Sequence, residues 1–583
     1  MILQKISENN KLLILSLLVG LCSGAAAVVL EKAILFIQKG VAPLVASHSG
    51  FNWALLVLPA VGMLLALLTV RYVIKDNIGH GVTKVLKAIS MGEAHIKPHN
   101  MWSSIATSAV TIGFGGSVGA EAPIVYTGAA IGSNLGRKFG LTIRSITILV
   151  GCGAAGAVAG IFKAPLAGVL FTLEILIFNI SVTSMMPLLI STVSATVVSY
   201  IFLGNQTPFQ CSISPFQMVN IPFYLILGVF CALVSLYFQR MTLYLEDVLV
   251  KFRNPFLKWA VCGLGLGVLV LLFPPLYGEG YGYVDLLLSG GSIQRLSGSP
   301  LAGMLTSAWA LPVFFLLVLL FKVISMTLTN AGGGVGGTFG PTLFIGAIGG
   351  FVLVRFLNLI LASTDISLPE QNFVLAGMAG AMAGVMQAPM TAIFLIAEIT
   401  GGYELFLPLI ITSTVSFGVT RVWEKYSIYT KRLAQAGELL THDSDRSVIT
   451  LMRTADLVRD KYPRLLPDVK LGDAVNVIAD NSTAVIAVVD KEDVFMGYID
   501  IGNVRKYLFD TEKYDLLRAR DLMEEAPAYI FKDEKMETVM GKFDKTHAWR
   551  LPVVDENMKY LGFISRSRLL IAYREKLKEY SQD

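Results

Sequence analysis

The feature that most constrains the fold of this chain is an internal repeat. Residues 153–175 (GAAGAVAGIFKAPLAGVLFTLEI) and residues 377–399 (GMAGAMAGVMQAPMTAIFLIAEI) are identical at ten of twenty-three positions. A second pair precedes these copies, with GGSVGAEAPIVYTGAAIG at 115–132 matching GGVGGTFGPTLFIGAIGG at 333–350. Two related apolar halves, interrupted by Gly and Pro at corresponding places, are typical of transporters and channels built from repeats with broken helices. The repeat therefore predicts a substrate site where the broken helices of the two halves meet.

Charge is distributed unevenly along the chain. Of its 583 residues, 54% are apolar and only 15% are charged, against about a quarter in an ordinary soluble domain. Several uncharged stretches before about residue 420 approach the roughly 20 residues that a bilayer span needs. Others, such as 102–114 and 343–354, are too short or broken for a simple span and are expected to be buried in protein or to line a cavity. We therefore predict an all-α membrane domain of two related, inverted halves followed by a soluble tail. The expected boundaries are 1–430 for the membrane domain, roughly 1–210 and 220–430 for its halves, 431–446 for a linker and 447–583 for the tail.

The flanking charges predict the orientation of the chain in the bilayer. Lys5 and Lys11 lie at the start, and the Lys- and Arg-rich tail follows the last apolar segment, so the positive-inside tendency places both ends in the cytoplasm. This predicts a multi-pass protein of the cell (inner) membrane, with the lipid bilayer as a partner. The net charge of +5 does not indicate nucleic-acid binding, and the five cysteines show no metal-ligand spacing.

The tail is expected to be a second repeat, of two α/β units at about 455–510 and 518–575. Each unit reads as helix, strand, turn, strand, helix, and the second follows the first by about 60 residues. The expected strands are 485–489, 494–499, 549–554 and 560–565, and the expected helices are 473–479, 501–508, 536–543 and 567–573.

The Gly-rich turns of the repeat are candidate anion sites. GGSVGAEAP leads into a helix that begins near Glu121, and free backbone N–H groups at a helix N-terminus favour an anion. The carboxylate of Glu121 is therefore either a helix cap or an occupant of that site. The matching turn GGTFGP places Phe339 at the same position, and GHGVTKV predicts a third helix start at His80, either a pore-facing group or a structural residue. Tyr429 follows the last apolar segment and is either an interfacial anchor or a ligand contact.

Two acids recur at matching ends of apolar segments, Glu174 and Glu398. Intramembrane acids are candidates for function. Their duplication favours instead a shared structural role, such as capping backbone groups at a helix end. Lys163 lies in an otherwise neutral run, where it either attracts anions or extends to an interface.

Together these motifs resemble those of the CLC family of chloride channels and proton-coupled chloride antiporters, over essentially the whole chain. GHGVT resembles the family's GSGIP, GAEAP resembles GREGP, whose glutamate is the external gate, and GTFGP resembles GIFAP. The tyrosine of IYTKRL matches the pore tyrosine, and the tail resembles a tandem pair of CBS domains. The resemblance implies passage of chloride or similar small anions, no required cofactor, and a homodimer with a separate pathway in each subunit.

The resemblance also implies roles for individual residues. Glu121, when ionised, would compete with chloride for its outer site and, when protonated, would swing aside. Neutral dipoles would bind the anion without trapping it as a full positive charge would. The implied anion contacts are His80, Gly119, Ala120, Ala122, Thr338, Phe339, Gly340 and Tyr429.

Several positions depart from the family pattern. His80 stands where Ser is usual, and Ala120 and Ala122 replace the Arg and Gly that usually flank the gate, so gating is expected to be altered. Antiporter members carry a second acid directly after the position of Glu174, where it relays protons from the cytoplasm. Here that residue is Ile175, which cannot carry a proton. This favours passive, channel-like conduction, with a proton-coupled antiporter as the alternative.

The adenosine-binding pattern of CBS domains is incomplete in the tail. The first unit offers Asp500 and Asn503, the second offers Ser565 and Arg568, and neither has the ribose-binding Asp at its usual place. An adenine nucleotide ligand and a purely structural tail both remain open. A CBS-based membrane sensor and a membrane enzyme are rival functions, although no metal cluster, Ser–His pair or phosphate-binding loop in the sequence favours an enzyme.

Overall fold

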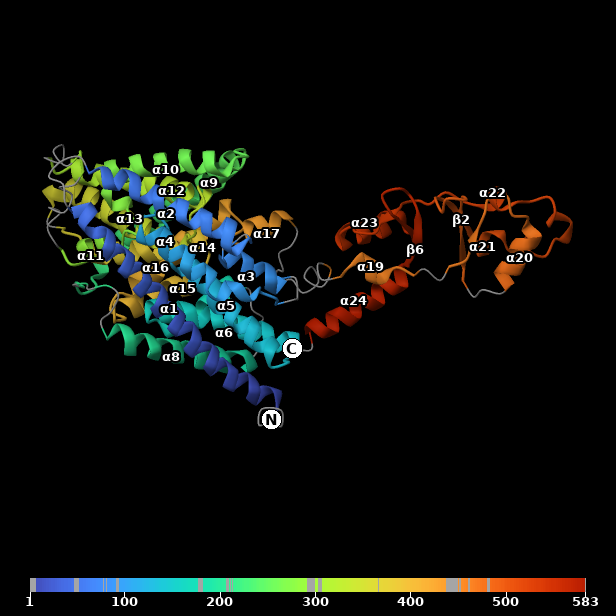
Figure 1. Cartoon of the computed structure of the whole chain (residues 1–583), viewed down its shortest axis with the longest axis horizontal. Coiled ribbons are helices and arrows are strands. Elements are labelled where there is room, and N and C mark those ends of the chain that lie inside the picture. The colour runs from blue at the N-terminus through green and yellow to red at the C-terminus, as the bar shows by residue number, and fades with distance from the viewer. Residues whose placement is uncertain are drawn as a thin grey trace. The chain divides into compact units, whose positions relative to one another are not determined.

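The chain divides into two compact units, Met1–Glu438 and Leu439–Asp583, whose elements are labelled in Figure 1. The computed structural model describes the whole chain except for residues 1–6, 47–51, 77, 80, 91–93, 177–181, 206–208, 210, 212, 291–298, 302–306, 365, 437–448, 450–451, 460–461, 480–482 and 582–583.

The first unit is helical and consists of two halves with corresponding elements. The first half contains α1 (Glu8–Ala46), α2 (Trp53–Leu68), α3 (Gly81–Ser90), α4 (Ser103–Gly113), α5 (Glu121–Lys138), α6 (Ile143–Phe162), α7 (Pro165–Ile175) and α8 (Val182–Leu203). The second contains α9 (Ile221–Val250), α10 (Pro255–Leu272), α11 (Tyr281–Leu288), α12 (Ala310–Ala331), α13 (Phe339–Ile360), α14 (Glu370–Met386), α15 (Pro389–Ile399) and α16 (Phe406–Trp423), and α17 (Lys431–Ala436) follows. The predicted all-α repeat architecture is confirmed.

The repeated residues produce the same chain turn twice. Helix α6 ends where Lys163 adopts the left-handed region at φ 55°, and α14 ends where Gln387 does so, also at φ 55°. Each is followed by Ala and then by a proline, Pro165 or Pro389, at the first position of the next helix. Proline is suited to this position because its fixed φ is helical and its missing N–H has no helical partner there. The motifs KAP and QAP are thus matching breaks between two helices.

The matching glycines mark close helix contacts. A Cβ on Gly128 of α5 would collide with the carbonyl of Gly153 on α6, and a Cβ on Gly153 would collide with the carbonyl of Gly128. In the second half, Gly346 of α13 and Gly377 of α14 are related in the same way. Helices approach this closely only where neither carries a side chain at the contact. The same glycines therefore occur in both copies of the repeat because each copy contains a helix pair in close backbone contact.

Large apolar side chains are exposed on the surface of the membrane unit. Among the described residues, nine helices are long and apolar enough to cross a bilayer. Large apolar side chains on them are exposed, including Phe36 on α1, Ile201 on α8 and Leu264 on α10. We predicted stretch 102–114 to be short, and it forms the 11-residue α4. For 343–354 the expected break was wrong, because this stretch lies inside the 22-residue α13, which begins at the Gly-rich turn. Its expected burial in protein is confirmed, since nearly every residue of the stretch is buried.

The second unit contains two three-stranded sheets of the same topology. The first has order β1–β2–β3, from β1 (Arg464–Leu465), β2 (Val485–Val489) and β3 (Phe495–Asp500), and the second has order β4–β5–β6, from β4 (Ile530–Phe531), β5 (Arg550–Val554) and β6 (Tyr560–Ser565). In each sheet the first pair is parallel and the second antiparallel. The predicted strands are present, whereas β1 and β4 were not predicted because two-residue strands carry no periodicity.

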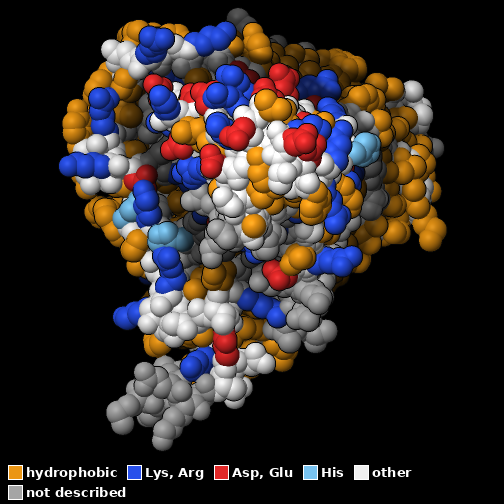
Figure 2. Space-filling view, turned by 90° about the vertical axis from the view of Figure 1, so that its right-hand side faces the viewer, with side chains coloured by type: hydrophobic (Ala, Val, Ile, Leu, Met, Phe, Trp, Pro, Cys, Tyr) orange, Lys and Arg blue, Asp and Glu red, His pale blue; other side chains and the backbone are white. Residues whose placement is uncertain are grey.

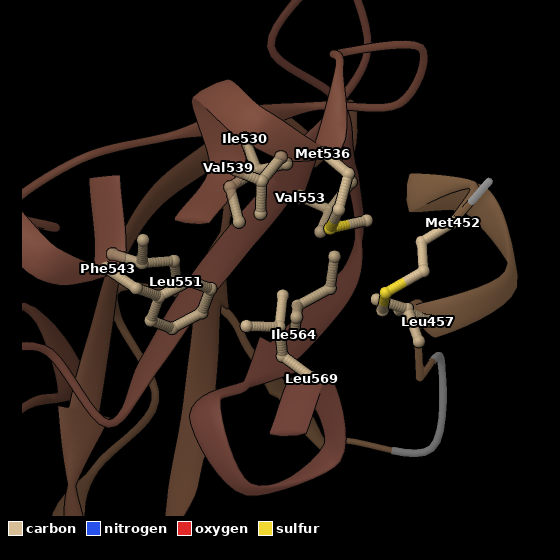
Figure 3. Packing of buried hydrophobic residues seen from close by; sticks show 10 residues of the cluster. All are labelled: Met452, Leu457, Ile530, Met536, Val539, Phe543, Leu551, Val553, Ile564 and Leu569. Carbon is tan, nitrogen blue, oxygen red and sulfur yellow. The ribbon is translucent and has the colours of Figure 1, made fainter. Parts of the chain in front are cut away.

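Helices cover these sheets in the predicted α/β order. They are α19 (Thr454–Leu457), α20 (Leu471–Ala479), α21 (Ile501–Val504), α22 (Ala519–Leu522), α23 (Met536–Thr546) and α24 (Arg566–Ser581). Figure 3 shows that Met452 and Leu457, which precede the first sheet in sequence, belong to the same buried cluster as Val553 and Ile564 of the second sheet. The segment that precedes the first α/β unit of the tail is thus part of the core of the second unit. Charged side chains of both signs lie on the face of the chain displayed in Figure 2, as expected for a unit with ordinary soluble composition.

Candidate functional site

The two Gly-rich turns of the repeat lie side by side. The N–H of Gly119 donates to the carbonyl of Gly337 at 3.0 Å, and the N–H of Gly337 donates back at 2.7 Å. Helix α5 begins two residues after Gly119, at Glu121, and α13 begins two residues after Gly337, at Phe339. The pairing therefore brings the positive N-terminal ends of two helices, one from each half, to a single place.

The carboxylate of Glu121 occupies the N-terminal end of the opposite helix. Its Oε2 accepts the N–H of Gly340 on α13 at 3.2 Å, and its Oε1 accepts the hydroxyl of Tyr281 on α11 at 2.5 Å. The side chain is buried, with Glu121 2% exposed. A Cβ on Gly119 would collide with Oε2, and one on Gly340 would lie 3.0 Å from Oε1. Both glycines are thus required for the carboxylate to reach this position.

A tyrosine and a threonine form the other side of the site. The hydroxyl of Thr338 donates to that of Tyr429 at 3.2 Å, and both residues are buried. Thr83 of α3 contacts the backbone carbonyl of Tyr429 at 3.4 Å. The side chain of Phe339 is turned away into an aromatic cluster, with ring centroids 5.3 Å from Phe162 and 6.1 Å from Phe171. Phe339 therefore offers the site its backbone.

Helix α3 brings a third N-terminal end to the same place. A Cβ on Gly81, its first residue, would lie 2.6 Å from the carbonyl of Ala122. The structure thus gathers the predicted residues of all three helix starts except His80, which lies outside the described residues. Ala122 itself packs against Gly337, where a Cβ would be 2.7 Å from the Ala122 methyl group.

Two cavities lie on either side of the segment 120–122. The larger, of about 360 Å³, is lined by Ala120 and Glu121 together with Glu31, Lys163, Phe209, Glu279 and Tyr281, and we call it the Glu279 cavity. The smaller, of about 30 Å³, is lined by Ala122, Gly337, Thr338 and Tyr429 together with Gly81, Thr83, Glu246 and Arg432, and we call it the Tyr429 cavity. About 10–15 Å³ of such space holds one water molecule, so the smaller cavity has room for a small ion. The segment 120–122 thus contributes residues to the walls of both cavities.

Three site residues were missed by the sequence analysis: Glu279, Tyr281 and Lys322. The carboxylate of Glu279 accepts the N–H of Ala120 at 3.0 Å. Lys322 is fully buried in α12, and its ammonium group donates to the Ser117 hydroxyl at 2.9 Å and to two backbone carbonyls. Lys322 could have been recognised from the sequence, because it lies inside the apolar run FFLLVLLFKVISM and charged residues in membrane helices are rarely without a function.

The duplicated acids cap each other's helices. Oxygens of Glu174, near the end of α7, accept the N–H groups of Met390 and Thr391 at the start of α15, at 3.0 and 2.7 Å. Glu398, near the end of α15, accepts the N–H groups of Leu166 and Ala167 at the start of α7, at 3.0 and 2.8 Å. A capping role was predicted, but each acid caps the opposite half and not its own helix. The two helices are therefore antiparallel.

The remaining predicted residues are not among those that line the two cavities. Ile175 is buried at the end of α7, with 3% exposed. In the tail, Asp500 accepts the N–H of Gly502 at 2.8 Å and so caps α21, while Asn503 donates to Glu524 at 2.8 Å. Ser565 accepts the N–H of Arg568 at 3.3 Å. These pairs follow the last strands of the two sheets, β3 and β6.

The chain is similar to known membrane proteins. Residues 61–421 match the family described as "Voltage gated chloride channel", and residues 519–575 match the CBS domain. The "Voltage-gated ClC-type chloride channel ClcB" of Salmonella typhimurium is 26% identical over 441 residues, covering 73% of this chain and 99% of the relative. The "H(+)/Cl(-) exchange transporter ClcA" of Salmonella paratyphi B is 26% identical over 432 residues, covering 70% of this chain and 85% of the relative. A solved "slow cyanobacterial Cl-/H+ antiporter" shares the fold with a TM-score of 0.63 at 22% identity, over 73% of this chain and 97% of that chain.

Proposed function

Since this chain belongs to the voltage gated chloride channel (CLC) family, we propose that it passes chloride or a similar small anion across a membrane, through a pathway gated by Glu121. It is a multi-pass integral membrane protein, and members of this family are transporters or channels, not enzymes. We also propose which residues hold the anion and whether protons move with it.

The observation that carries the proposal is the position of the Glu121 carboxylate. It accepts the N–H of Gly340 at the start of α13, a group that would otherwise be available to an anion. The side chain therefore acts as an internal anion. When it is protonated, its negative charge no longer favours this position, and a chloride can replace it. The Tyr429 cavity would then receive the anion, with backbone N–H groups of Thr338 and Phe339 and the Tyr429 hydroxyl as its neutral donors.

Passive conduction is favoured by the side chains of α7. Ile175 is aliphatic and buried, so it offers no group that a proton can bind. Glu174, the adjacent acid, holds two backbone N–H groups and the hydroxyl of Thr391 at 2.7 Å. These three hydrogen bonds hold the carboxylate in one position, and a side chain that cannot move is a poor carrier of protons.

A proton-coupled antiporter is the second candidate, and the exchange function named for a 26% identical relative favours it. The test is a flux measurement on proteoliposomes with the membrane potential clamped by valinomycin and potassium. We expect chloride to move down its gradient without driving protons uphill. Sustained proton movement against its gradient, abolished by Glu121→Gln, would instead assign the chain as an antiporter.

We further propose a homodimer with a pathway in each subunit, and a cytoplasmic N-terminus and tail. Light scattering with subtraction of the detergent mass tests the first, and protease protection of the tail in sealed inside-out and right-side-out vesicles tests the second. In the tail, local bonds already engage Asp500, Asn503 and Ser565, which supports a structural role over tight binding of an adenine nucleotide. Titration of the full-length protein with ATP and AMP by calorimetry tests this.

A further inference from the structure

We propose that Glu279 is the second carboxyl group of the gate and that its negative charge sets the pH at which the gate opens. The inference rests on the proposed role of Glu121 as the gate. It assigns to a residue outside the repeat motifs a part in controlling anion passage.

A single turn of chain holds the gate from two sides. Glu279 lies between Gly278 and Gly280, whose φ values of 63° and 89° are in the left-handed region that favours glycine. Its carboxylate accepts the N–H of Ala120, the residue before the gate, at 3.0 Å. Two residues later, Tyr281 donates its hydroxyl to the Glu121 carboxylate at 2.5 Å. The turn therefore contacts both the backbone and the side chain of the gate segment.

Both carboxyl groups face the same space. Glu121 and Glu279 line the Glu279 cavity, which also contains Tyr281. A proton that enters this cavity can reach either acid, because both side chains form its wall. An anion that leaves Glu121's position toward this cavity passes Glu279 as well.

The charges around the two acids do not balance. The charged and titratable groups that face Glu279 are Glu121 on α5, Tyr281 on α11 and Lys322 on α12, and the cavity adds Glu31 on α1 and Lys163 after α6. Lys322 is the nearby buried cation, and it donates to the backbone carbonyls of Gly278 and Glu279 at 2.9 and 3.2 Å. These hydrogen bonds hold the turn in place. The single positive charge of Lys322 cannot offset the two negative charges of ionised Glu121 and Glu279.

Two carboxylates that share one buried cation take up a proton as a pair. Removing two negative charges from water is costly unless each is compensated. The favoured state of the gate therefore has one proton between Glu121 and Glu279. Groups that interact in this way titrate together, and removing one of them changes the pH at which the other ionises. An ionised Glu279 favours a protonated Glu121, and hence an open gate, at higher pH than Glu121 would show alone.

Glu279→Gln tests this, because it removes the charge and keeps an oxygen that can accept the N–H of Ala120. We expect the midpoint of chloride flux against pH to move to more acidic pH by about one unit, a tenfold change in proton concentration. Glu279→Asp keeps the charge and should stay near the wild-type midpoint. Should Glu279→Gln fail to fold, Glu279→Asn against Glu279→Asp is a second pair that differs in charge at equal size.

Glu31→Gln is the matched control, since Glu31 lines the same cavity from α1. It should move the midpoint by much less than Glu279→Gln. The double variant Glu121→Gln with Glu279→Gln should be as insensitive to pH as Glu121→Gln alone. A Glu279→Gln curve that superimposes on wild type, while Glu121→Gln abolishes the pH dependence, would overturn this inference alone. Absence of chloride flux in the wild-type protein at every pH would overturn the proposed function itself.

Discussion

Removing the reciprocal caps between α7 and α15 should destabilise the membrane unit by amounts that the contacts allow us to rank. Glu398→Ala takes away the acceptor of the N–H groups of Leu166 and Ala167. Losing an N-terminal cap costs about 0.5–2 kcal/mol, and these N–H groups are partly shielded from water, so we expect about 2 kcal/mol. Glu174→Ala loses the corresponding pair and also the hydroxyl of Thr391 at 2.7 Å. One more hydrogen bond is worth about 1 kcal/mol, which gives about 3 kcal/mol.

The two losses should add. The caps lie near opposite ends of an antiparallel pair of helices. On α7 the capped Leu166 and the capping Glu174 are eight residues apart, which corresponds to a separation of about 12 Å. Effects at sites further apart than about 7–10 Å usually add within about 0.5 kcal/mol. The double variant should therefore lose about 5 kcal/mol.

The assay is equilibrium unfolding of the purified protein in mixed micelles of increasing SDS fraction, followed by tryptophan fluorescence. Glu404→Ala, at an exposed acid after α15, is the control and should change the free energy of unfolding by less than about 0.5 kcal/mol. A cost below about 0.5 kcal/mol for Glu174→Ala would refute the capping argument. So would a double variant no less stable than Glu174→Ala alone, because the two caps could not then be independent.

Three other perturbations test the site and the packing. Glu121→Gln should give chloride flux that is faster and insensitive to external pH, measured in proteoliposomes; an unchanged pH profile would place the gate elsewhere. Tyr429→Phe should weaken chloride binding measured by calorimetry by about 1.5–3 kcal/mol, the value of one hydrogen bond to a charged group, whereas unchanged affinity would leave Tyr429 only a structural partner of Thr338. Gly153→Val should reduce the yield of folded protein in size-exclusion chromatography, because its side chain would collide with the carbonyl of Gly128, while Gly418→Val, where a Cβ meets nothing within 4 Å, should not.

The sequence by itself determined the repeat, the positions where helices break and the helix starts that form the site. These features are local: a Gly-rich turn before Glu121, or an Ala-Pro pair after Lys163, carries its backbone preference within a few residues. Both copies of the repeat carry these backbone preferences, so aligning the two copies was enough to match Glu121 with Phe339. The four longer strands of the tail, β2, β3, β5 and β6, were recognisable in the same way from their apolar or alternating residues.

The tertiary structure alone decided which distant residues meet. Glu174 and Glu398 were recognisable as caps, but their partners lie 216 to 232 residues away in the opposite half, a distance at which no local pattern operates. Glu279 and Lys322 reach the gate from a turn and a helix outside the repeat motifs, 159 residues from Ala120 and 205 residues from Ser117. The spacing of residues along a helix or strand reports which face a side chain occupies. It does not report which other helix packs on that face, since that depends on how all the helices fill the unit together.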